Sequence, residues 1–419
     1  MRFTVVTFGS DGDTRPFAHL CRGLIDAGHA VRLFGDRSSL PIATALGVPA
    51  EALAGDVRTT LPIADPRQAL QMRDVLGTWR NLVRLIADNT HSWIEAIAAQ
   101  ARDSDAILFS GVAMYAGLAA ALELNKPRIG LWLLPITTTG EFPSPMMAPV
   151  RMPAWLNRLT YRGLHATLWR WYGRATDPAR QKIFGGGPRG RIHLECPILY
   201  GISSQLIARP SDWPATHRLC GHWSLASTQW QAPATLLEFL AAGPPPIYIG
   251  FGSPSCFVRR KRLDLLIAAV AGRRAVFYPG WSRIDSSMLP GNFFVLGETP
   301  HTWLFPRCSV VIHHGGAGTT HSSARAGVPS IVLPFGADQF FWASRLTAAG
   351  VAPKHVRSSA LTAATLASML EYTQRDDVRQ RARQLGAAMA RENGIAAAVR
   401  HIEELMQSGQ NGFDTAQRT

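Results

Sequence analysis

Short apolar segments alternate with helical segments in two successive series, and this alternation restricts the possible folds more than any other feature of the sequence. The first series opens with RFTVVTF at residues 2–8 and ends with RIGLWLL at residues 128–134. The second opens with IYIGFG at residues 247–252 and ends with SIVLPF at residues 330–335. Short apolar strands separated by helices are typical of parallel sheets covered on both faces. The sequence therefore predicts an α/β protein with two doubly wound, Rossmann-like parallel sheets.

The domain boundaries follow from the length and from the interruption between the two series. A chain of 419 residues is longer than one compact domain usually is. The stretch between the series that is rich in Ala and Pro reads as a linker, and the last residues read as a disordered tail. We therefore expect an N-terminal domain at 1–222, a linker at 223–246, a C-terminal domain at 247–407 and a tail at 408–419.

The expected compartment is a reducing cytoplasm. The five cysteines lie far apart without a CxxC pair, which favours neither a zinc site nor a disulfide framework. The apolar run at residues 3–8 is too short for the core of a signal peptide. The longest uncharged stretch, residues 106–122, is predicted to be a strand, a turn and a helix rather than a membrane span, because Ser110 and Gly111 divide it.

The charge balance predicts an anionic partner. Lys and Arg number 43 against 29 Asp and Glu, so the formal net charge is +14. A nucleotide diphosphate, an acidic lipid and a nucleic acid would all fit this charge. No nucleic-acid-binding motif is present, so no nucleic-acid partner is expected. The sequence also has no HExxH motif and no Cys/His cluster, so no metal is expected.

The segment at residues 135–190 has no strand pattern and is rich in Trp, Met and Arg. Residues 151–190 hold seven Arg and one Lys against one acid, Asp177. One interpretation is a solvated helical face over an ordinary core. The other is an acceptor pocket or a membrane-facing lip, because aromatic, Met and cationic side chains together suit an amphipathic ligand or an acidic lipid surface. The second interpretation assigns acceptor binding to Met146, Trp155 and Trp169, and leaves open contact with the inner face of an acidic membrane.

The loop at residues 9–16 (GSDGDTRP) follows the first predicted strand and opens a helix. In parallel α/β sheets this is where ligands bind. The loop is not GxGxxG, and its two acids would repel a phosphate, which makes Asp13 better suited to receive a proton. The structural alternative is that Asp13 is the N-cap of the helix that contains Pro16.

A second loop, HHGGAGTT at residues 313–320, leaves a strand and enters a helix. Its glycines, hydroxyls and His supply backbone and side-chain donors, together with a helix dipole, to one anion such as a diphosphate. A similar turn at residues 250–253 ends the first strand of the second series. Asp338 and Gln339 follow another strand at the same rim, where a carboxylate and an amide suit a polyhydroxylated ring.

The run from Glu298 to Leu346 resembles the donor-binding signature of the UDP-glycosyltransferase superfamily, particularly its sterol and antibiotic-aglycone glucosyltransferase branch. The loop FGSDGDTRP resembles the GSRGD-type loop of that branch. Residues 197–213 and 221–223 resemble its segment before the linker. The resemblance therefore touches both halves of the chain, whereas residues 135–190 match little.

This resemblance implies the GT-B fold, in which two Rossmann-like domains face a central cleft, and an inverting, metal-independent transfer. A UDP- or dTDP-sugar would be the co-substrate, with no other cofactor. Asp13 matches the proposed general base, and Asp338 and Gln339 match the residues that hold the sugar hydroxyls. The diphosphate would be held by the matching positions Ser10, Ser253, His314, Gly316, Gly318 and Thr319.

Three positions depart from the pattern of the family. Asp11 stands where the loop usually has Arg, Glu298 stands where the plant enzymes have a Trp that stacks on uracil, and Ser322 stands where they carry an acid for the ribose. We therefore expect the nucleoside to be bound through groups around Thr299, Pro300 and His301. Trp303 has two interpretations, a base-stacking residue or the anchor of a short helix.

The basic run at residues 259–262 (RRKR) follows the turn at 250–253, and it reads either as a neighbour of an anion or as a solvated loop.

Three functions are compatible with the sequence. The preferred one is transfer of a hexose, with glucose expected, to a hydroxyl of a hydrophobic acceptor such as a sterol, a polyketide or another natural-product aglycone. The first alternative is a nucleotide-sugar epimerase or hydrolase on the same fold. The second is a non-enzymatic protein whose basic surface binds an anionic membrane or nucleic acid.

Overall fold

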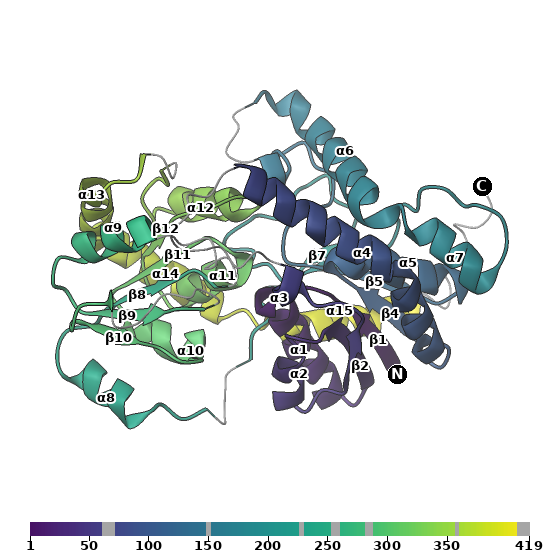
Figure 1. The fold of residues 1–419 in the computed structure, drawn as a ribbon, viewed down its shortest axis with the longest axis horizontal. Helices are drawn as coiled ribbons and strands as arrows, with labels where there is room; N and C mark the ends of the chain where they lie inside the picture. The colour runs from purple at the N-terminus through teal and green to yellow at the C-terminus, as the bar shows by residue number, and fades with distance from the viewer. Residues whose placement is uncertain are drawn as a thin grey trace.

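The computed structural model describes residues 1–60, 72–147, 152–225, 230–252, 260–280, 288–356 and 360–408. These residues form two parallel sheets, one in each half of the chain (Figure 1). The first has the order β3-β2-β1-β4-β5-β6-β7 and the second the order β10-β9-β8-β11-β12. The strands are β1 (Arg2–Val6), β2 (Ala30–Asp36), β3 (Ala50–Leu53), β4 (Ala106–Phe109), β5 (Arg128–Trp132), β6 (Ile198–Tyr200), β7 (His217–Leu219), β8 (Ile247–Gly250), β9 (Ala275–Tyr278), β10 (Phe293–Val295), β11 (Val310–His313) and β12 (Ser330–Val332).

Helices cover both sheets. Those of the first half are α1 (Asp11–Asp26), α2 (Pro41–Ala45), α3 (Val57–Thr60), α4 (Met72–Ala101), α5 (Met114–Glu123), α6 (Asn157–Leu168) and α7 (Thr176–Phe184), with a π-helical turn at Trp169–Gly173. Those of the second half are α8 (Ala234–Ala241), α9 (Arg260–Val270), α10 (His301–Leu304), α11 (Ala317–Arg325), α12 (Gln339–Ala348), α13 (Ala363–Gln374), α14 (Asp376–Ala390) and α15 (Gly394–Ser408).

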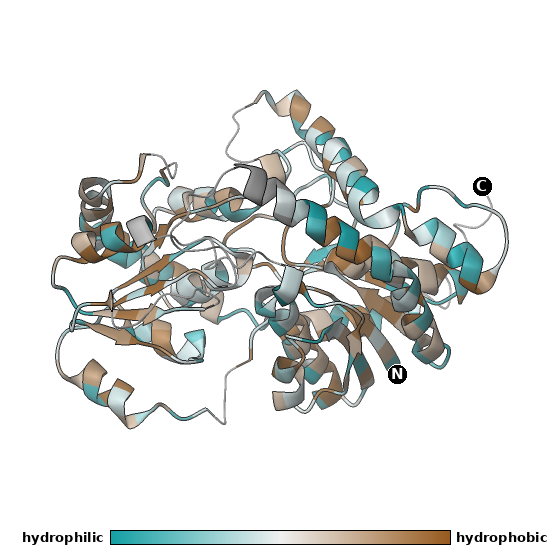
Figure 2. Ribbon diagram, viewed as in Figure 1, coloured by the Kyte–Doolittle hydropathy of each residue, from teal (hydrophilic) through white to brown (hydrophobic). Residues whose placement is uncertain are grey.

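The central strands are apolar along their whole length because helices bury both of their faces. All residues of β4, β8 and β11 are buried, and Figure 2 shows the strands of both sheets largely in the hydrophobic colour. As predicted, residues 106–122 form a strand, a turn and a helix, here β4 and α5. Within the described residues, no helix combines the length and the apolar character needed to span a bilayer.

The order of the strands reverses once in each sheet. In the first sheet the chain runs outward from β1 through β2 to β3 and returns on the other side at β4; in the second it runs outward from β8 and returns at β11. Ligands of parallel α/β sheets bind outside the carboxyl ends of the strands at such reversal points. The two loops singled out from the sequence, at residues 9–16 and 313–320, follow β1 and β11 and therefore lie at these points.

The last helix, α15, packs against the first half of the chain and not against the second sheet. Ile395, Ala398, Val399 and Ile402 of α15 belong to the core under the first sheet, together with Phe3 and Phe17 among others. At Gly23 of α1 a Cβ would lie 2.1 Å from Cγ2 of Ile395, so the small residue permits the close approach of the two helices. The region expected as the C-terminal domain, 247–407, thus includes a helix that packs on the first half.

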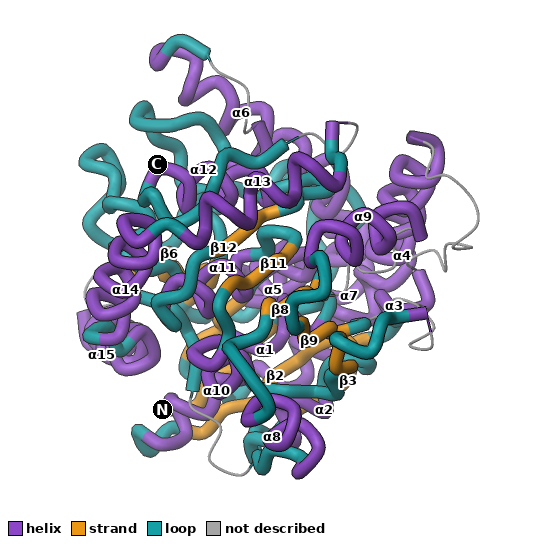
Figure 3. Tube along the Cα trace, turned by 90° about the vertical axis from the view of Figure 1, so that its left-hand side faces the viewer, coloured by secondary structure: helices purple, strands orange, loops and turns teal. Residues whose placement is uncertain are grey.

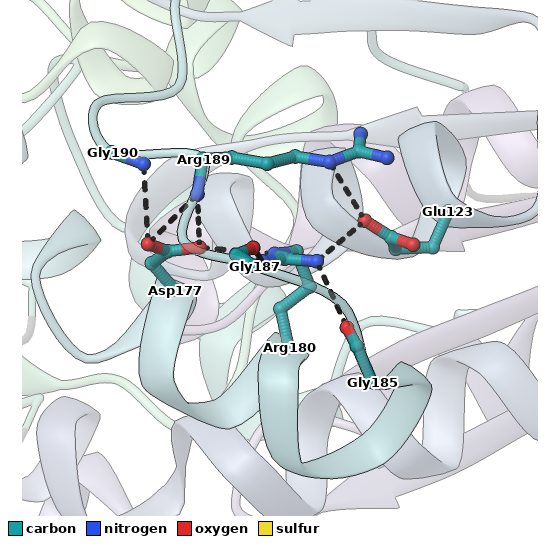
Figure 4. A network of polar contacts seen from close by, with 7 residues as sticks. All are labelled: Glu123, Asp177, Arg180, Gly185, Gly187, Arg189 and Gly190. Carbon is teal, nitrogen blue, oxygen red and sulfur yellow. Dashed lines mark hydrogen bonds and ion pairs between the residues drawn. The ribbon is translucent and has the colours of Figure 1, made fainter.

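The basic segment contains a buried ion-pair network around Arg180 (Figure 4). The Arg180 side chain is 3% exposed and donates to Asp177 Oδ1 at 3.0 Å and to Glu123 Oε1 at 3.1 Å. Asp177 also accepts from the backbone N–H groups of Arg189 and Gly190, and Arg189 lies 3.2 Å from Glu123. The network holds the loop after α7 against α5 and α7. Part of the positive charge at residues 151–190 is therefore neutralised by ion pairs within the protein.

We expect Arg180→Ala to lower the free energy of unfolding by about 3–5 kcal/mol, because it leaves two poorly exposed carboxylates without their shared cation. Chemical denaturation followed by circular dichroism measures this. Arg174→Ala is the matched control: Arg174 is exposed and has no ion pair with any described residue, so a change within about 0.5 kcal/mol is expected. Equal effects of the two substitutions would contradict a structural role for the network.

Candidate functional site

A cleft of about 1230 Å³ lies between the two halves of the chain. Its lining combines the loop after β1 and α1 with the loop after β11, the start of α11 and the turn after β12. Eleven of the residues singled out from the sequence line it: Ser10, Asp13, Thr299, Pro300, His301, His314, Gly316, Gly318, Thr319, Asp338 and Gln339. The fold thus brings together groups that lie more than three hundred residues apart in the sequence.

Asp13 lies in the first turn of α1, where it is the third helical residue. The N-cap is Ser10 rather than Asp13, because Asp11 and Gly12 already have helical geometry. Asp13 instead stands at the third helical position of a capping box with Ser10, so it keeps a structural role at the start of the helix. Oδ2 of Asp13 accepts from both the backbone N–H and the Oγ–H of Ser10, at 2.9 Å each. Burial raises the pKa of Asp13 above its ordinary value, although the bonds from Ser10 act in the opposite direction.

Gly9 makes room for this arrangement. Its φ is +151°, and a Cβ there would lie 2.5 Å from Oδ2 of Asp13. A side chain at residue 9 would therefore displace the carboxylate.

The turn between β11 and α11 presents the start of a helix to the cleft. Gly315 has φ +95°, and a Cβ at Gly316 would lie 2.5 Å from Nε2 of His314, so the two glycines let the chain fold closely around the ring. Burial lowers the pKa of His314 to about 4, which leaves its imidazole neutral near pH 7. Its Nδ1 has no hydrogen-bond partner among the described residues. A neutral ring and the free backbone N–H groups of a helix start form a donor set suited to an anion.

Asp338 ends the turn between β12 and α12 as the N-cap of the helix, and Gln339 is the first residue of α12. Oδ2 of Asp338 accepts from Nε1 of Trp342 at 2.9 Å. Burial, with a smaller contribution from the charge of Asp13, raises the pKa of Asp338 to about 6. Oε1 of Gln339 accepts from the backbone N–H groups of Phe335 and Gly336, so its oxygen is fixed while its amide nitrogen has no bond to a described residue. Asp338 and Asp13 both line the cleft, so the catalytic candidate of the first half and the sugar-binding candidate of the second share one site.

Thr299, Pro300 and His301 line the cleft where the chain enters α10. The ring of His301 stacks on Phe305 at 4.2 Å, and Thr299 Oγ1 donates to the carbonyl of Gly297 at 3.1 Å. Trp303 does not line the cleft; it packs against Trp230 with 4.9 Å between ring centroids and lies under the guanidinium of Arg307. The interpretation of Trp303 as a helix anchor fits this packing.

Glu298 contacts residues from both halves of the chain in the cleft, which the sequence did not predict. Its Oε2 lies 3.8 Å from the guanidinium of Arg15 on α1, and its Oε1 accepts from the hydroxyl of Tyr278. Both Arg15 and Tyr278 line the cleft, and neither was singled out. Arg15 lies only two residues after Asp13, so its place on the helix that opens the cleft was the available signal.

The residues assigned to the acceptor lie elsewhere. Trp155 is 76% exposed and Met146 is 38% exposed, while Trp169 is half-buried against the edge of Tyr115 at 5.2 Å. None of the three lines the cleft, whose apolar lining in the first half includes Leu133 and Leu134. Their assignment to acceptor binding stays a prediction.

The turn at 250–253 and the basic run at 259–262 are described only in part. Ser253 and Arg259 lie outside the described residues, whereas Gly252 lines the cleft. The guanidinium of Arg262 lies 4.4 Å from the centre of the Phe335 ring. Among the described residues, no group of three His, Cys, Asp or Glu side chains is arranged to hold a metal ion.

His321 connects α11 to the first half of the chain. Its Nε2 accepts from the backbone N–H of Ser203 at 3.2 Å, and its Nδ1–H donates to the carbonyl of Ala317 at 2.8 Å. The ring also stacks on His222, with 5.2 Å between centroids. The bond from Ser203 requires Nε2 to be unprotonated and therefore a neutral ring, and burial lowers the pKa of His321 to about 4. The helix that opens the candidate anion site is therefore held against the first sheet by an uncharged His.

We expect stability to fall as the pH drops from about 6.5 towards 4. The unfolded chain protonates His321 near pH 6.5 and the folded chain near pH 4, so its contribution is complete above pH 6.5 and decreases below it, by up to about 3 kcal/mol at pH 4. Denaturation of the wild type and of His321→Gln at pH 7.5 and pH 5 measures the effect. Asp338 acts in the opposite sense in both proteins, so only a shallower decline in the variant supports this assignment, and parallel declines would refute it.

Comparison with known proteins shows the same architecture. A family model, the erythromycin biosynthesis protein CIII-like C-terminal domain, matches residues 267–405. The chain is 30% identical to the sterol 3-beta-glucosyltransferase UGT80A2 of Arabidopsis thaliana, over 99% of this chain and 67% of that one. It is also 30% identical to the O-mycaminosyltylonolide 6-deoxyallosyltransferase of Streptomyces fradiae, over 96% of this chain and 97% of that one.

Solved structures agree with these relatives. The glycosyltransferase VinC, crystallised in complex with dTDP, superposes with a TM-score of 0.65 at 18% identity and covers 98% of this chain and 100% of its own. This likeness confirms the GT-B fold expected from the resemblance. The sequence relatives show the family itself. The chain belongs to the UDP-glycosyltransferase superfamily and is a glycosyltransferase.

Proposed function

We propose that this protein transfers a hexose from a UDP- or dTDP-sugar to a hydroxyl of a hydrophobic acceptor, a sterol, a polyketide or another natural-product aglycone, with inversion and without a metal ion. The observation that carries the proposal is the meeting, in one cleft, of the Asp13 carboxylate with the helix start, His314 and Asp338 of the other half. Relatives named for sterols and for a macrolide substrate support the acceptor class.

The chemistry of transfer places Asp13 at the acceptor. The acceptor oxygen would form the bond to the anomeric carbon while the bond from that carbon to the diphosphate oxygen breaks, and the nucleoside diphosphate leaves. Asp13 would take the hydroxyl proton. Its environment suits this role, because burial makes the carboxylate more basic and the two bonds from Ser10 hold it in one orientation. Attack from the side opposite to the leaving group inverts the configuration.

The second half would hold the donor. The start of α11 and His314 would bind the diphosphate, and their partial positive charges would stabilise the negative charge that develops on it as it leaves. Asp338 and the free amide nitrogen of Gln339 would bind sugar hydroxyls. The nucleoside would lie toward Thr299, Pro300 and His301, where the choice between uracil and thymine stays open.

The experiment that tests this function is mass spectrometry of products from UDP- and dTDP-hexoses with a panel of hydrophobic hydroxyl acceptors and small polar controls. We expect a glycosylated hydrophobic acceptor, with equal yield in the presence of EDTA. Release of free sugar in the presence of every acceptor would indicate a hydrolase, and an epimerised nucleotide sugar would indicate an epimerase. Activity lost in EDTA and restored by Mg²⁺ or Mn²⁺ would contradict metal independence.

A further inference from the structure

Exposed large apolar side chains gather around the start of α6. Of the eight exposed large hydrophobic residues among those described, four lie between residues 146 and 159: Trp155 is 76% exposed, Leu159 53%, Met147 41% and Met146 38%. The backbone N–H of Ser144 donates to Thr160 Oγ1 at 2.8 Å, so the turn that carries the two Met residues is fastened to the first turn of α6. These four exposed residues, together with the exposed face of α6, are called here the α6 edge.

The exposed face of α6 continues this edge. Trp155, Leu159, Arg162, Ala166 and Arg170 are all exposed and recur every three or four residues, which places them along one side of the helix and its continuation. On the opposite side, Tyr161 and Leu164 are buried in a hydrophobic core that includes residues of both halves of the chain. Figures 1 and 3 show α6 standing out from the body of the molecule in both views.

The charge along the α6 edge is positive. Arg162, Arg170 and Arg174 are exposed and form no ion pair with any described residue, in contrast to Arg180 and Arg189 of the buried network. The nearby acids are already engaged: Asp212 pairs with Arg158 at 3.0 Å, and Glu141 accepts from the backbone and the hydroxyl of Ser211. An apolar tip is thus followed along one helix face by guanidinium groups that form no ion pair with a described acid.

We propose that the α6 edge docks on an anionic lipid bilayer. Trp155 and Leu159 would enter the boundary between headgroups and acyl chains, where an indole with both apolar and hydrogen-bonding parts is favoured. Arg162, Arg170 and Arg174 would contact the lipid phosphates. A bilayer fits better than a protein groove or a nucleic acid, because apolar and cationic side chains share one protruding edge and line no described cavity. Docking is independent of the proposed sugar transfer, although it would bring the cleft close to lipophilic acceptors.

The test is flotation of the full-length protein with vesicles of phosphatidylcholine containing about one third phosphatidylglycerol, beside vesicles of phosphatidylcholine alone, at 0.1 M salt. We expect binding to the anionic vesicles that weakens in 0.5 M salt. The double variant W155S/L159S and the double variant R162E/R170E should each reduce partitioning about tenfold or more. Matched controls are Leu237→Ser on α8, 49% exposed, and Arg391→Glu at the end of α14, which should bind like the wild type.

Failure to bind anionic vesicles, or equal binding by the edge variants and the controls, would overturn the proposal. Equal binding to neutral vesicles would also overturn it, because the arginines would then have no role. Acceptor kinetics of Trp155→Ala with a water-soluble acceptor and no vesicles separate docking from the acceptor pocket. A raised acceptor KM with vesicle binding intact would assign Trp155 to the substrate and refute docking. None of the binding measurements requires turnover, so failure of the proposed transfer would leave them interpretable.

Discussion

Asp13→Asn is expected to lower kcat about a hundredfold or more while changing the affinity for the nucleotide sugar little. The amide cannot take the proton of the acceptor hydroxyl, and loss of a positioned general base usually costs a factor of about 10² to 10⁴. Asn keeps the shape of Asp and can still accept from Ser10, so the loop and the cleft should stay intact. Steady-state kinetics with saturating donor, together with titration calorimetry of donor binding, separate the two effects.

The matched control is Asp11→Asn. Asp11 lies in the same first turn of α1 and lines the same cleft, but it does not receive the two bonds from Ser10 that orient Asp13. We expect a much smaller loss of kcat in this variant. The pH profile gives a second readout: activity of the wild type should rise with pH as Asp13 loses its proton, at a pH above the ordinary range of Asp because burial raises its pKa. An Asp13→Asn enzyme with near-normal turnover across this range would show that Asp13 only supports the helix.

His314→Ala is expected to weaken nucleotide-sugar binding by about 1.5–3 kcal/mol, a loss of roughly 10- to 150-fold in affinity, as for a hydrogen bond to a charged group. Because burial lowers the pKa of His314 to about 4, the ring is neutral above pH 6. Donor affinity of the wild type should therefore not change through His314 titration between pH 6 and pH 8. Titration calorimetry with UDP-glucose and dTDP-glucose measures both effects.

His19→Ala provides the comparison for His314. His19 also lines the cleft as a neutral ring, with its pKa lowered to about 4 by burial, but it lies on α1 in the other half. We expect a smaller loss of donor affinity when this ring is removed from protein that remains folded. Unchanged affinity of His314→Ala for both donors would place the diphosphate elsewhere in the cleft.

The sequence alone was sufficient to predict those strands and turns of this protein that depend on the local residue pattern. Buried parallel strands such as β4 and β11 are apolar without interruption, so their position and type could be predicted from the residues alone. The glycine-rich turns follow those strands directly, and the rule that ligands bind at the carboxyl ends of parallel strands placed both loops at one site. The donor-binding resemblance supplied the fold, which the relatives and the solved structures confirm.

Contacts between distant segments could not be predicted in this way. A periodic pattern indicates which face of an element is buried, but not which element covers it, so nothing in α15 revealed that Ile395 and Ile402 pack under the first sheet. The bonds of Arg15 with Glu298 and of His321 with Ser203 join residues that share no local pattern. Trp155 is a second example of this limit. The composition of its segment was compatible with either a pocket or an exposed surface, and only tertiary packing determines that Trp155 is 76% exposed.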